Sequence, residues 1–263
     1  MANGPDSPVL NRLSGRCFPA KSAILNVLIS SLAKRHPIDD TDRDALQTLP
    51  VAVQRLIPRD TIASPEGAGT FNIVVDGLIA RSKPFRSGTR QITALYLPED
   101  TFGCPTTLED PAALELHAIT EAHIARISAG ALFDLARTQP NIALALYQQA
   151  RRDFVIMEQW AINVGRRDAI RRLAHFLSEM AARFSAAGRN EGKRIFLPLS
   201  QQQIADALGL TAIHVNRCLR SLREQKLIGL HRHFVEFLDL DGLHRLGSFQ
   251  GAYLDADSML PLT

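Results

Sequence analysis

The segment QQQIADALGLTAIHVNRCLR, from Gln201 to Arg220, decides the fold of the second half of this 263-residue chain. Ser200 precedes it as a helix N-cap, and Gln203 three residues later completes a capping box. Gly209 supplies the positive φ that a short turn between two helices requires, and Thr211 can cap the second helix. Ala205 is small enough for close helix approach, and the apolar residues at the positions that two steeply crossing helices bury are Ile204, Leu208, Leu210, Val215 and Cys218. The spacing predicts a helix-turn-helix.

The residues after this segment predict a two-stranded ribbon. LREQKLIGL (222–230) leads into a strand, His231-Arg232-His233 can turn the chain, and FVEFLDL (234–240) returns. A ribbon directly after the second helix is typical of a winged helix that binds DNA. A helical hairpin without a DNA-binding role would share the packing pattern but would not need the ribbon.

The second predicted helix, Thr211 to Gln225, offers side chains suited to the major groove. Arg217 can address guanine bidentately, Asn216 can pair with adenine or take a phosphate, and Ile213 offers apolar contact to a thymine methyl. His214 can contact the DNA backbone and Arg220 can contact a phosphate. The alternative for both residues is that they lie on a solvated helix face. The candidate DNA-binding residues are Gln201, Gln202, Thr211, Ala212, Ile213, His214, Asn216, Arg217 and Arg220.

Charge is distributed unevenly, although the net charge is only +3. Residues 166–233 hold 13 Lys and Arg against 5 Asp and Glu, whereas residues 234–263 hold 1 against 5. A basic block suits a polyanionic partner such as DNA, because neutralising phosphates releases counterions. A solvated, arginine-rich helix face is the alternative.

The first half of the chain is rich in predicted strands. Two short helices are expected first, over residues 25–35 and then after Asp40 as N-cap. From Val51 to Ile127, β-prone runs at 71–75, 78–82, 91–97, 116–120 and 123–127 alternate with turn signals. Short strands joined by tight turns predict an antiparallel roll, barrel or sandwich.

A long helix is predicted from Pro140, a favoured first helical residue, to Val164, with Gly165 ending it. Its heptad seam, which predicts dimerisation, consists of Ala143, Tyr147, Ala150, Phe154, Met157, Ala161 and Val164. The opposite face carries Ile142, Leu146, Ile156 and Trp160. The two apolar stripes could be buried by the β-rich domain on one side and by a symmetry-related chain on the other. The alternative is a helix packed only on its own domain.

A further helix, 169–184, is expected after Asp168 as N-cap, with apolar residues on one face and arginines on the other. We expect a loop over 185–194 and a loosely ordered segment from 247 onward. The expected divisions are an N-terminal arm (1–21), a β-roll sensor domain (22–137), a dimerisation helix (138–165), a winged-helix domain (166–250) and a C-terminal tail (251–263).

From about Leu25 to Leu246 the chain resembles the Crp/Fnr family of bacterial transcription regulators. The resemblance rests on RDTIASPEG (59–67), FNIVVDGLI (71–79), LPEDTFG (97–103) and GRRDAIRRLAHFL (165–177), followed by the helix-turn-helix segment. It implies an α+β fold with an N-terminal cyclic-nucleotide-binding-type β-roll, a long dimerisation helix and a C-terminal winged helix-turn-helix. It also implies a homodimer on a palindromic double-stranded DNA operator, base-reading roles for Ala212, Ile213, Asn216 and Arg217, and RNA polymerase as a partner if the protein activates. Many relatives have a glutamate at the position of Ile213.

The resemblance weakens at the effector pocket. Cyclic-AMP-binding members have Gly-Glu and then Arg-Ser or Arg-Thr, where this chain has Gly103-Cys104-Pro105 and Ala112-Ala113. Without that glutamate and arginine the cyclic phosphate would be unpaired, so a response to cyclic AMP is not expected. An iron-sulfur cluster would need about four thiolates, and the arm holds only Cys17. Haem ligation by His117 or His123, and redox roles for Cys104 or Cys218, stay open; the cofactor is unknown.

Other function classes fit the sequence less well. The chain shows no signal-peptide core and no apolar run of the roughly 20 residues that a membrane span needs, so a cytoplasmic location without membrane partners is expected. No phosphate-binding Gly-rich loop, GxSxG or HExxH motif is present, so an enzyme is not expected. The rival class is a small-molecule or redox sensor whose winged helix mediates protein contacts.

Overall fold

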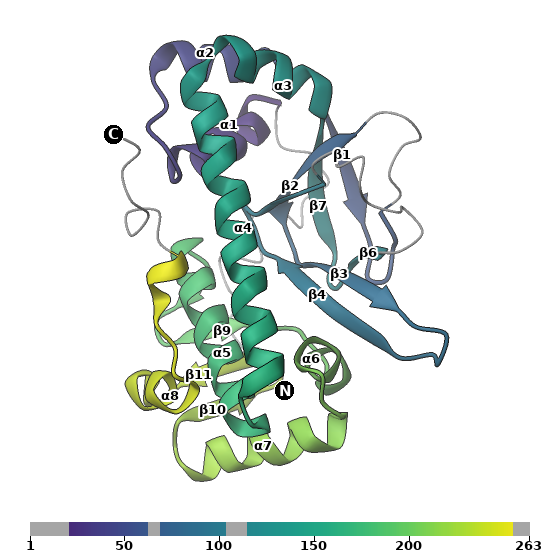
Figure 1. Cartoon of the computed structure of the whole chain (residues 1–263), viewed down its shortest axis with the longest axis vertical. Coiled ribbons are helices and arrows are strands. Elements are labelled where there is room, and N and C mark those ends of the chain that lie inside the picture. Colours follow the sequence, from purple (N-terminus) through teal and green to yellow (C-terminus); the bar gives the residue numbers. More distant parts are fainter. Residues whose placement is uncertain (1–20, 63–68, 104–114, 255–263) are drawn as a thin grey trace, which may run out of the picture.

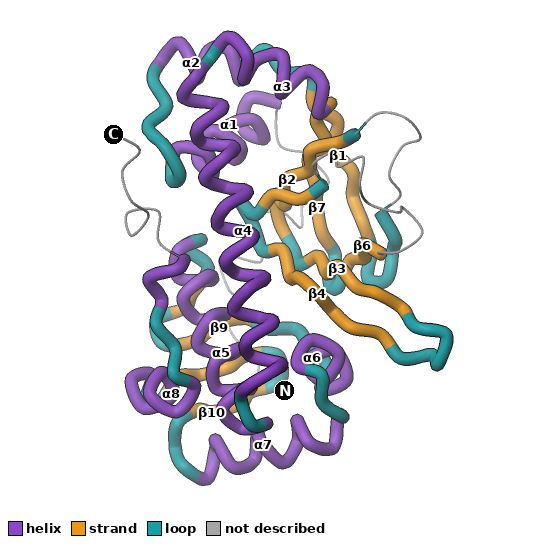
Figure 2. The backbone as a smooth tube through the Cα atoms, in the orientation of Figure 1, coloured by secondary structure: helices purple, strands orange, loops and turns teal. Residues whose placement is uncertain are grey.

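One long helix, α4 (Pro140–Arg166), runs nearly the length of the molecule and connects its two halves (Figure 1). The computed structural model describes residues 21–62, 69–103 and 115–254. Strands gather on one side of the N-terminal half of α4, and most of the C-terminal half of the chain is helical (Figure 2). The α+β architecture predicted from the sequence is confirmed.

The N-terminal half is a β-roll made of two antiparallel sheets. Its strands are β1 (Val51–Leu56), β2 (Thr70–Asp76), β3 (Ile79–Pro84), β4 (Arg90–Tyr96), β5 (Thr101–Phe102), β6 (Glu115–Ala118) and β7 (Ala122–Ser128). The strand orders are β1-β7-β2-β5 and β4-β3-β6. Each predicted β-prone run overlaps a strand, and the runs at 78–82, 91–97 and 116–120 extend one or two residues beyond theirs. The predicted turn at Gly77 has φ +90, and a Cβ there would lie 2.5 Å from the Cβ of Ala122, so glycine is required.

Three helices pack against the roll: α1 (Lys21–Ala33), α2 (Asp40–Gln47) and α3 (Ala129–Thr138). The predicted N-cap of α2 was off by one residue: Asp39, not Asp40, accepts from the Asp42 amide, and Asp42 returns the bond in a capping box. The sequence analysis missed α3, although Ser128 is a standard N-cap and accepts from the Ala131 amide. These helices form one apolar core with β2, β7 and the start of α4, around Leu28, Leu46 and Ile142.

The helix α4 begins with Pro140, as predicted, but it does not end at Gly165. It continues to Arg166, and the break falls at Arg167, whose backbone is extended. Gly165 lacks a positive φ and nothing lies within 4 Å of a Cβ built on it, so it is an ordinary exposed helical residue. Asp168 then caps the next helix as predicted, by accepting from the Arg171 amide.

The C-terminal half consists of four α-helices, a 3-10 helix and a small sheet. The helices are α5 (Ala169–Ala186), α6 (Gln201–Leu208), α7 (Ala212–Glu224), α8 (Leu240–Gly247) and the 3-10 helix η2 (Gly251–Leu254). The strands are β8 (Asn190–Glu191), β9 (Arg194–Phe196), β10 (Ile228–His231) and β11 (Phe234–Phe237), in the order β10-β11-β9-β8. The predicted ribbon is therefore part of a larger sheet, and the predicted loop over 185–194 contains a short hairpin.

The two halves share one apolar core. Buried residues of the roll, among them Leu78, Ile92 and Leu95, belong to the same cluster as Leu173 of α5 and Val215 of α7. Trp160 of α4 lies in this cluster and meets Phe176 edge to face, with ring centroids 6.0 Å apart. The packing of the roll and α4 therefore fixes the position of the helix-turn-helix.

The segment after α8 packs more tightly than the sequence suggested. Phe249 and Leu254 are 9% exposed, and the Tyr253 hydroxyl donates to the buried Glu179 carboxylate at 2.9 Å. The ring of His175, 1% exposed, stacks on Tyr253 and meets Phe249 edge to face. The expectation of loose order is therefore wrong up to Leu254.

His175 should make stability depend on pH. Burial, with a contribution from nearby Arg167, lowers the pKa of His175 to about 4 from 6.5. Between these values the unfolded chain binds the proton more readily, so stability is lost as pH falls from 6.5 toward 4, by about 3 kcal/mol. In urea titrations His175→Phe should lose less stability over this range than the wild type. A His36→Phe control, in the turn after α1, should retain the wild-type profile; equal profiles for all three proteins would contradict the assignment.

Candidate DNA-binding site

The turn between α6 and α7 has the geometry that the sequence predicted. The Gln203 amide donates to Ser200 Oγ at 3.1 Å, and the Ser200 amide donates to Gln203 Oε1 at 2.8 Å. Gly209 adopts φ +61, and Thr211 accepts from the His214 amide at the start of α7. The capping box and both caps are confirmed.

One face of α7 is buried and the other is open. Val215 and Leu222 are 0% exposed and Cys218 is 9% exposed, whereas Ile213 is 66% exposed. The predicted packing residues Ile204, Leu208 and Ala205 are also buried, and Leu210 is half-buried. The open face lies at the end of the molecule opposite α2 and α3 (Figure 1).

The predicted DNA-binding residues all reach the surface of α6 and α7. Ala212 is half-buried, and the others are exposed: Gln201, Gln202, Thr211, Ile213, His214, Asn216, Arg217 and Arg220. Several are already partnered, since Asn216 donates to Gln201 Oε1 at 3.1 Å and Arg220 pairs with Glu224 at 2.8 Å. Within the described parts of the chain, Arg217 makes no hydrogen bond or ion pair.

Contacts that the sequence analysis missed hold this unit in place. Asp206 of α6, 8% exposed, pairs with Arg90 of β4 at 2.7 Å, and Gln91 donates to the Ala207 carbonyl at 3.1 Å. Arg172 of α5 donates to the Leu208 carbonyl at 2.7 Å and to the Arg167 carbonyl at 2.9 Å. The roll hairpin β3–β4 and the α4–α5 junction therefore both contact the end of α6.

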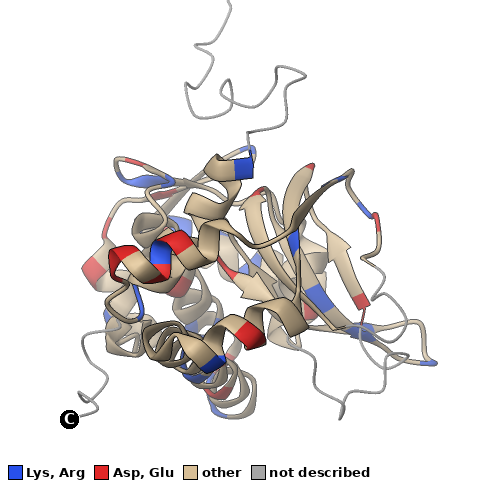
Figure 3. Ribbon diagram, turned by 90° about the horizontal axis from the view of Figure 1, so that it is seen from above, with Lys and Arg blue, Asp and Glu red and all other residues tan. Residues whose placement is uncertain are grey.

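The ribbon β10–β11 follows α7 as predicted, but its turn is shorter. His231 belongs to β10, and Arg232, with φ 54, and His233 make the turn. Arg232 is exposed. Seen from the end of the molecule that carries α2 and α3, blue and red positions are intermixed along the ribbon (Figure 3).

The seam predicted on α4 is largely open to solvent. Tyr147, Phe154 and Met157 are 56%, 61% and 47% exposed. Ala150 and Ala161 are also exposed, and Ala143 and Val164 are half-buried. Ile162, 41% exposed, widens the stripe and was not predicted. On the opposite face, Ile142 and Trp160 are buried, and Leu146 and Ile156 pack against the cores, so only one of the two stripes is covered.

The structure describes three of the cysteine and histidine residues considered for a redox or haem-binding role, namely Cys218, His117 and His123. Burial raises the pKa of Cys218, so its thiol packs as an apolar group rather than as a reactive thiolate. His117 is 8% exposed, its Nε2 has no partner among the described residues, and burial lowers its pKa. His123 is half-buried. Cys17, Cys104, Pro105, Ala112 and Ala113 lie outside the described residues.

The described residues contain no cluster of His, Cys, Asp or Glu that could hold a metal ion. None of their helices is long and apolar enough to cross a membrane.

Comparisons with known proteins agree with this geometry. Residues 171–246 match the Crp-like helix-turn-helix domain. The nitrogen fixation regulation protein FixK of Azorhizobium caulinodans is 29% identical over 222 residues, which cover 83% of this chain and 89% of that protein. FixK of Rhizobium meliloti is 32% identical over 157 residues, which cover 60% of this chain and 68% of that protein.

The structural neighbours carry the same fold. FixK2 from Bradyrhizobium japonicum superposes with a TM-score of 0.69 at 25% identity, covering 77% of this chain and all of that one. The capped helix-turn-helix, the open face of α7 and the likeness to these transcription regulators rather than to enzymes lead to one assignment. The chain belongs to the Crp/Fnr family of transcription regulators and carries that family's DNA-binding helix-turn-helix.

Proposed function

We propose that this protein is a homodimeric, sequence-specific regulator that places two α7 helices in successive major grooves of a roughly palindromic operator. The observation that carries the proposal is the open face of α7, where Ile213, Asn216 and Arg217 are exposed beside the N-cap Thr211. A helix N-terminus favours phosphate, and this would orient α7 with its first turns toward the bases.

The base contacts follow from donor and acceptor geometry. Arg217 is unpartnered among the described residues and long enough to reach guanine O6 and N7. Asn216 would exchange its bond with Gln201 for adenine or a phosphate. Ile213 has no hydrogen-bond acceptor, so it cannot read a cytosine as a glutamate at this position would. We therefore do not expect the half-site to carry that cytosine contact. Gln202, Ala212, His214 and Arg220 complete the proposed contact surface, Arg220 after release from Glu224.

Dimerisation is proposed along α4. Three large apolar side chains, Tyr147, Phe154 and Met157, are about half exposed on one stripe of the helix. Heptad spacing lets a symmetry-related copy of the same stripe cover them. A two-fold axis between the two α4 helices would also give the two recognition helices the symmetry of a palindrome.

Regulation is proposed to act through the angle between the roll and the DNA-binding domain. The break at Arg167 and Asp168 separates α4 from α5, and the contacts Arg90–Asp206 and Gln91–Ala207 link the roll to α6. An effector that favours one arrangement would shift the population of dimers that match the operator spacing. The sequence at 103–105 and 112–113 argues against cyclic AMP as this effector, and regulation without an effector is the alternative. RNA polymerase is a proposed partner if the regulator activates.

Arg217→Ala tests the reading surface. The operator is first selected from random duplexes with the wild-type protein. The substitution should weaken binding to that operator by about 5- to 150-fold per half-site, because a bidentate arginine contact to guanine contributes about 1–3 kcal/mol. It should also relax the preference at one base of each half-site, measured by repeating the selection.

Arg137→Ala is the matched control, because Arg137 lies on α3 and its side chain is 83% exposed. This variant should bind the operator like the wild type. Salt titration addresses the alternative that the winged helix contacts only proteins, since a DNA reader should lose affinity steeply as salt rises. Failure to select any palindromic site, or unchanged binding by Arg217→Ala, would overturn the proposed function.

A further inference from the structure

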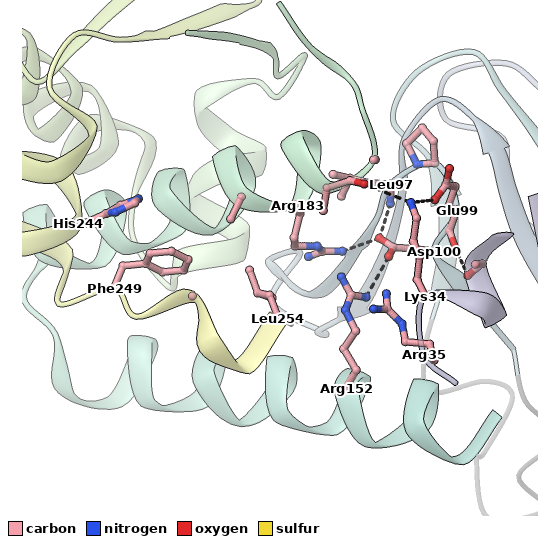
Figure 4. Close-up of a pocket in the computed structure, with 16 residues that line it drawn as sticks. Lys34, Arg35, Leu97, Glu99, Asp100, Arg152, Arg183, His244, Phe249 and Leu254 are labelled. Atoms are coloured by element: carbon pink, nitrogen blue, oxygen red, sulfur yellow. Dashed lines mark hydrogen bonds and ion pairs between the residues drawn. The ribbon is translucent and has the colours of Figure 1, made fainter. Parts of the chain in front are cut away.

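A cavity of about 330 Å³ lies where the two halves of the chain meet (Figure 4). Its walls come from the end of α1, the turn between β4 and β5, the middle of α4, the end of α5 and the segment after α8. This volume lies at the lower end of the range of about 300–1,000 Å³ that is usual for small-molecule sites. The site is separate from the DNA-binding surface of α7.

Four cations and two carboxylates line this cavity. The cations are Lys34, Arg35, Arg152 and Arg183, and the carboxylates are Glu99 and Asp100. Lys34 pairs with Glu99. Arg183 is held by Asp100 at 2.7 Å and by Glu179, behind the cavity wall, at 3.1 Å. These two cations are therefore satisfied by the protein.

Arg152 is only partly satisfied. Its NH1 group lies 3.1 Å from Asp100, a carboxylate that it shares with Arg183. Arg152 is 5% exposed, and its Nε is buried without a partner among the described residues. A buried donor without an acceptor is costly, so the Nε group of Arg152 still lacks an oxygen acceptor.

Arg35 has no carboxylate partner within residues 21–62, 69–103 and 115–254. Its Nε donates only to the Gln149 amide oxygen, at 2.8 Å, and Gln149 in turn donates to Asp153 at 3.0 Å. Asp153 is 44% exposed and lies 4.0 Å from the NH1 group of Arg152. Burial and the neighbouring charge of Arg152 lower the pKa of Arg35 to about 10. Arg35 therefore has no ion-pair partner of its own among these residues, and Arg152 shares Asp100 with Arg183.

We propose that this junction cavity binds a small organic anion, one with a carboxylate or phosphoryl group, between Arg35 and Arg152. Arginine is suited to planar, bidentate recognition of such oxygens. Leu97, Phe249 and Leu254 supply an apolar wall for the carbon skeleton of the ligand. The ligand would contact the roll and the C-terminal segment at once, so it would bias their arrangement; that regulatory effect, unlike binding itself, rests on the proposed function.

Calorimetry of the full chain without DNA tests the site, so the result does not depend on operator binding. The probes are inorganic phosphate, succinate and 3-phosphoglycerate at constant ionic strength, with succinamide as the neutral control. At least one anion should bind with one site per chain, and succinamide should not bind. Arg35→Gln should weaken binding by about tenfold or more, because a charge-assisted hydrogen bond is lost.

Arg137→Gln is the matched surface control and should bind like the wild type. Arg35→Lys keeps the charge without the planar fork, so it should bind with intermediate affinity, and it serves as the second variant if Arg35→Gln does not fold. The inference fails if none of the three anions binds to the wild type, or if the Arg35 variants bind as tightly as the wild type does.

Discussion

Phe154→Glu should convert the proposed dimer into a monomer and weaken operator binding by about 10²- to 10⁴-fold, the gain that joining two binding units commonly provides. Phe154 is 61% exposed in the single chain, so a glutamate there should leave the monomer folded. In the proposed dimer the same position faces its symmetry mate, where two carboxylates would lose apolar contact and repel each other. Sedimentation velocity and fluorescence anisotropy with the selected operator measure the two effects.

Phe133→Glu is the matched control, since Phe133 is also an exposed phenylalanine, at 44%, but lies on α3 outside the seam. It should leave both the dimer and the operator affinity unchanged. A Phe154→Glu protein that still sediments as a dimer would place the interface elsewhere. A monomer that binds operator with full affinity would instead contradict the need for two recognition helices.

The helix-turn-helix could be predicted because its constraints are local. The capping box of Ser200, the positive φ of Gly209 and the cap of Thr211 each depend on residues within a few positions along the chain. The alternating strands of the roll and the first residue of α4 were predictable for the same reason. Errors of one or two residues, at Asp39 and Gly165, arose where neighbouring residues can serve equally well as an end signal.

The charged contacts between distant segments could not be predicted in this way. Arg183 of α5 is 6% exposed because Asp100, from a turn of the roll, lies against α5 and pairs with it at 2.7 Å. Likewise, nothing near Asp206 in the sequence indicates its pairing with Arg90. Local sequence patterns do not indicate which distant residue an arginine pairs with, and only the assembled halves show these partners.

Arg183→Met should destabilise the protein by about 3–5 kcal/mol, since removing one member of a buried ion cluster leaves the others uncompensated. Arg183 donates to Asp100 at 2.7 Å, to Glu179 at 3.1 Å and to the Leu95 carbonyl at 2.6 Å. Burial raises the pKa of Asp100, but Arg183 and Arg152 outweigh it and lower that pKa below its usual value. Without Arg183, Asp100 would keep Arg152 as its counter-charge, whereas Glu179 would keep only the hydrogen bonds from Trp160 and Tyr253. Urea unfolding monitored by far-UV circular dichroism measures the loss.

Arg220→Met is the matched comparison, because Arg220 also pairs with a glutamate four residues away on a helix. The side chain of Arg220, however, is 75% exposed. Its removal should cost less than about 1 kcal/mol, since water screens an exposed pair. Adding Glu179→Gln to Arg183→Met should recover part of the lost stability, because a neutral amide oxygen can still accept the hydrogen bonds of Trp160 and Tyr253 without needing a counter-charge. Equal losses for Arg183→Met and Arg220→Met would mean that water already reaches the junction, and the buried charges would then not hold the two halves together.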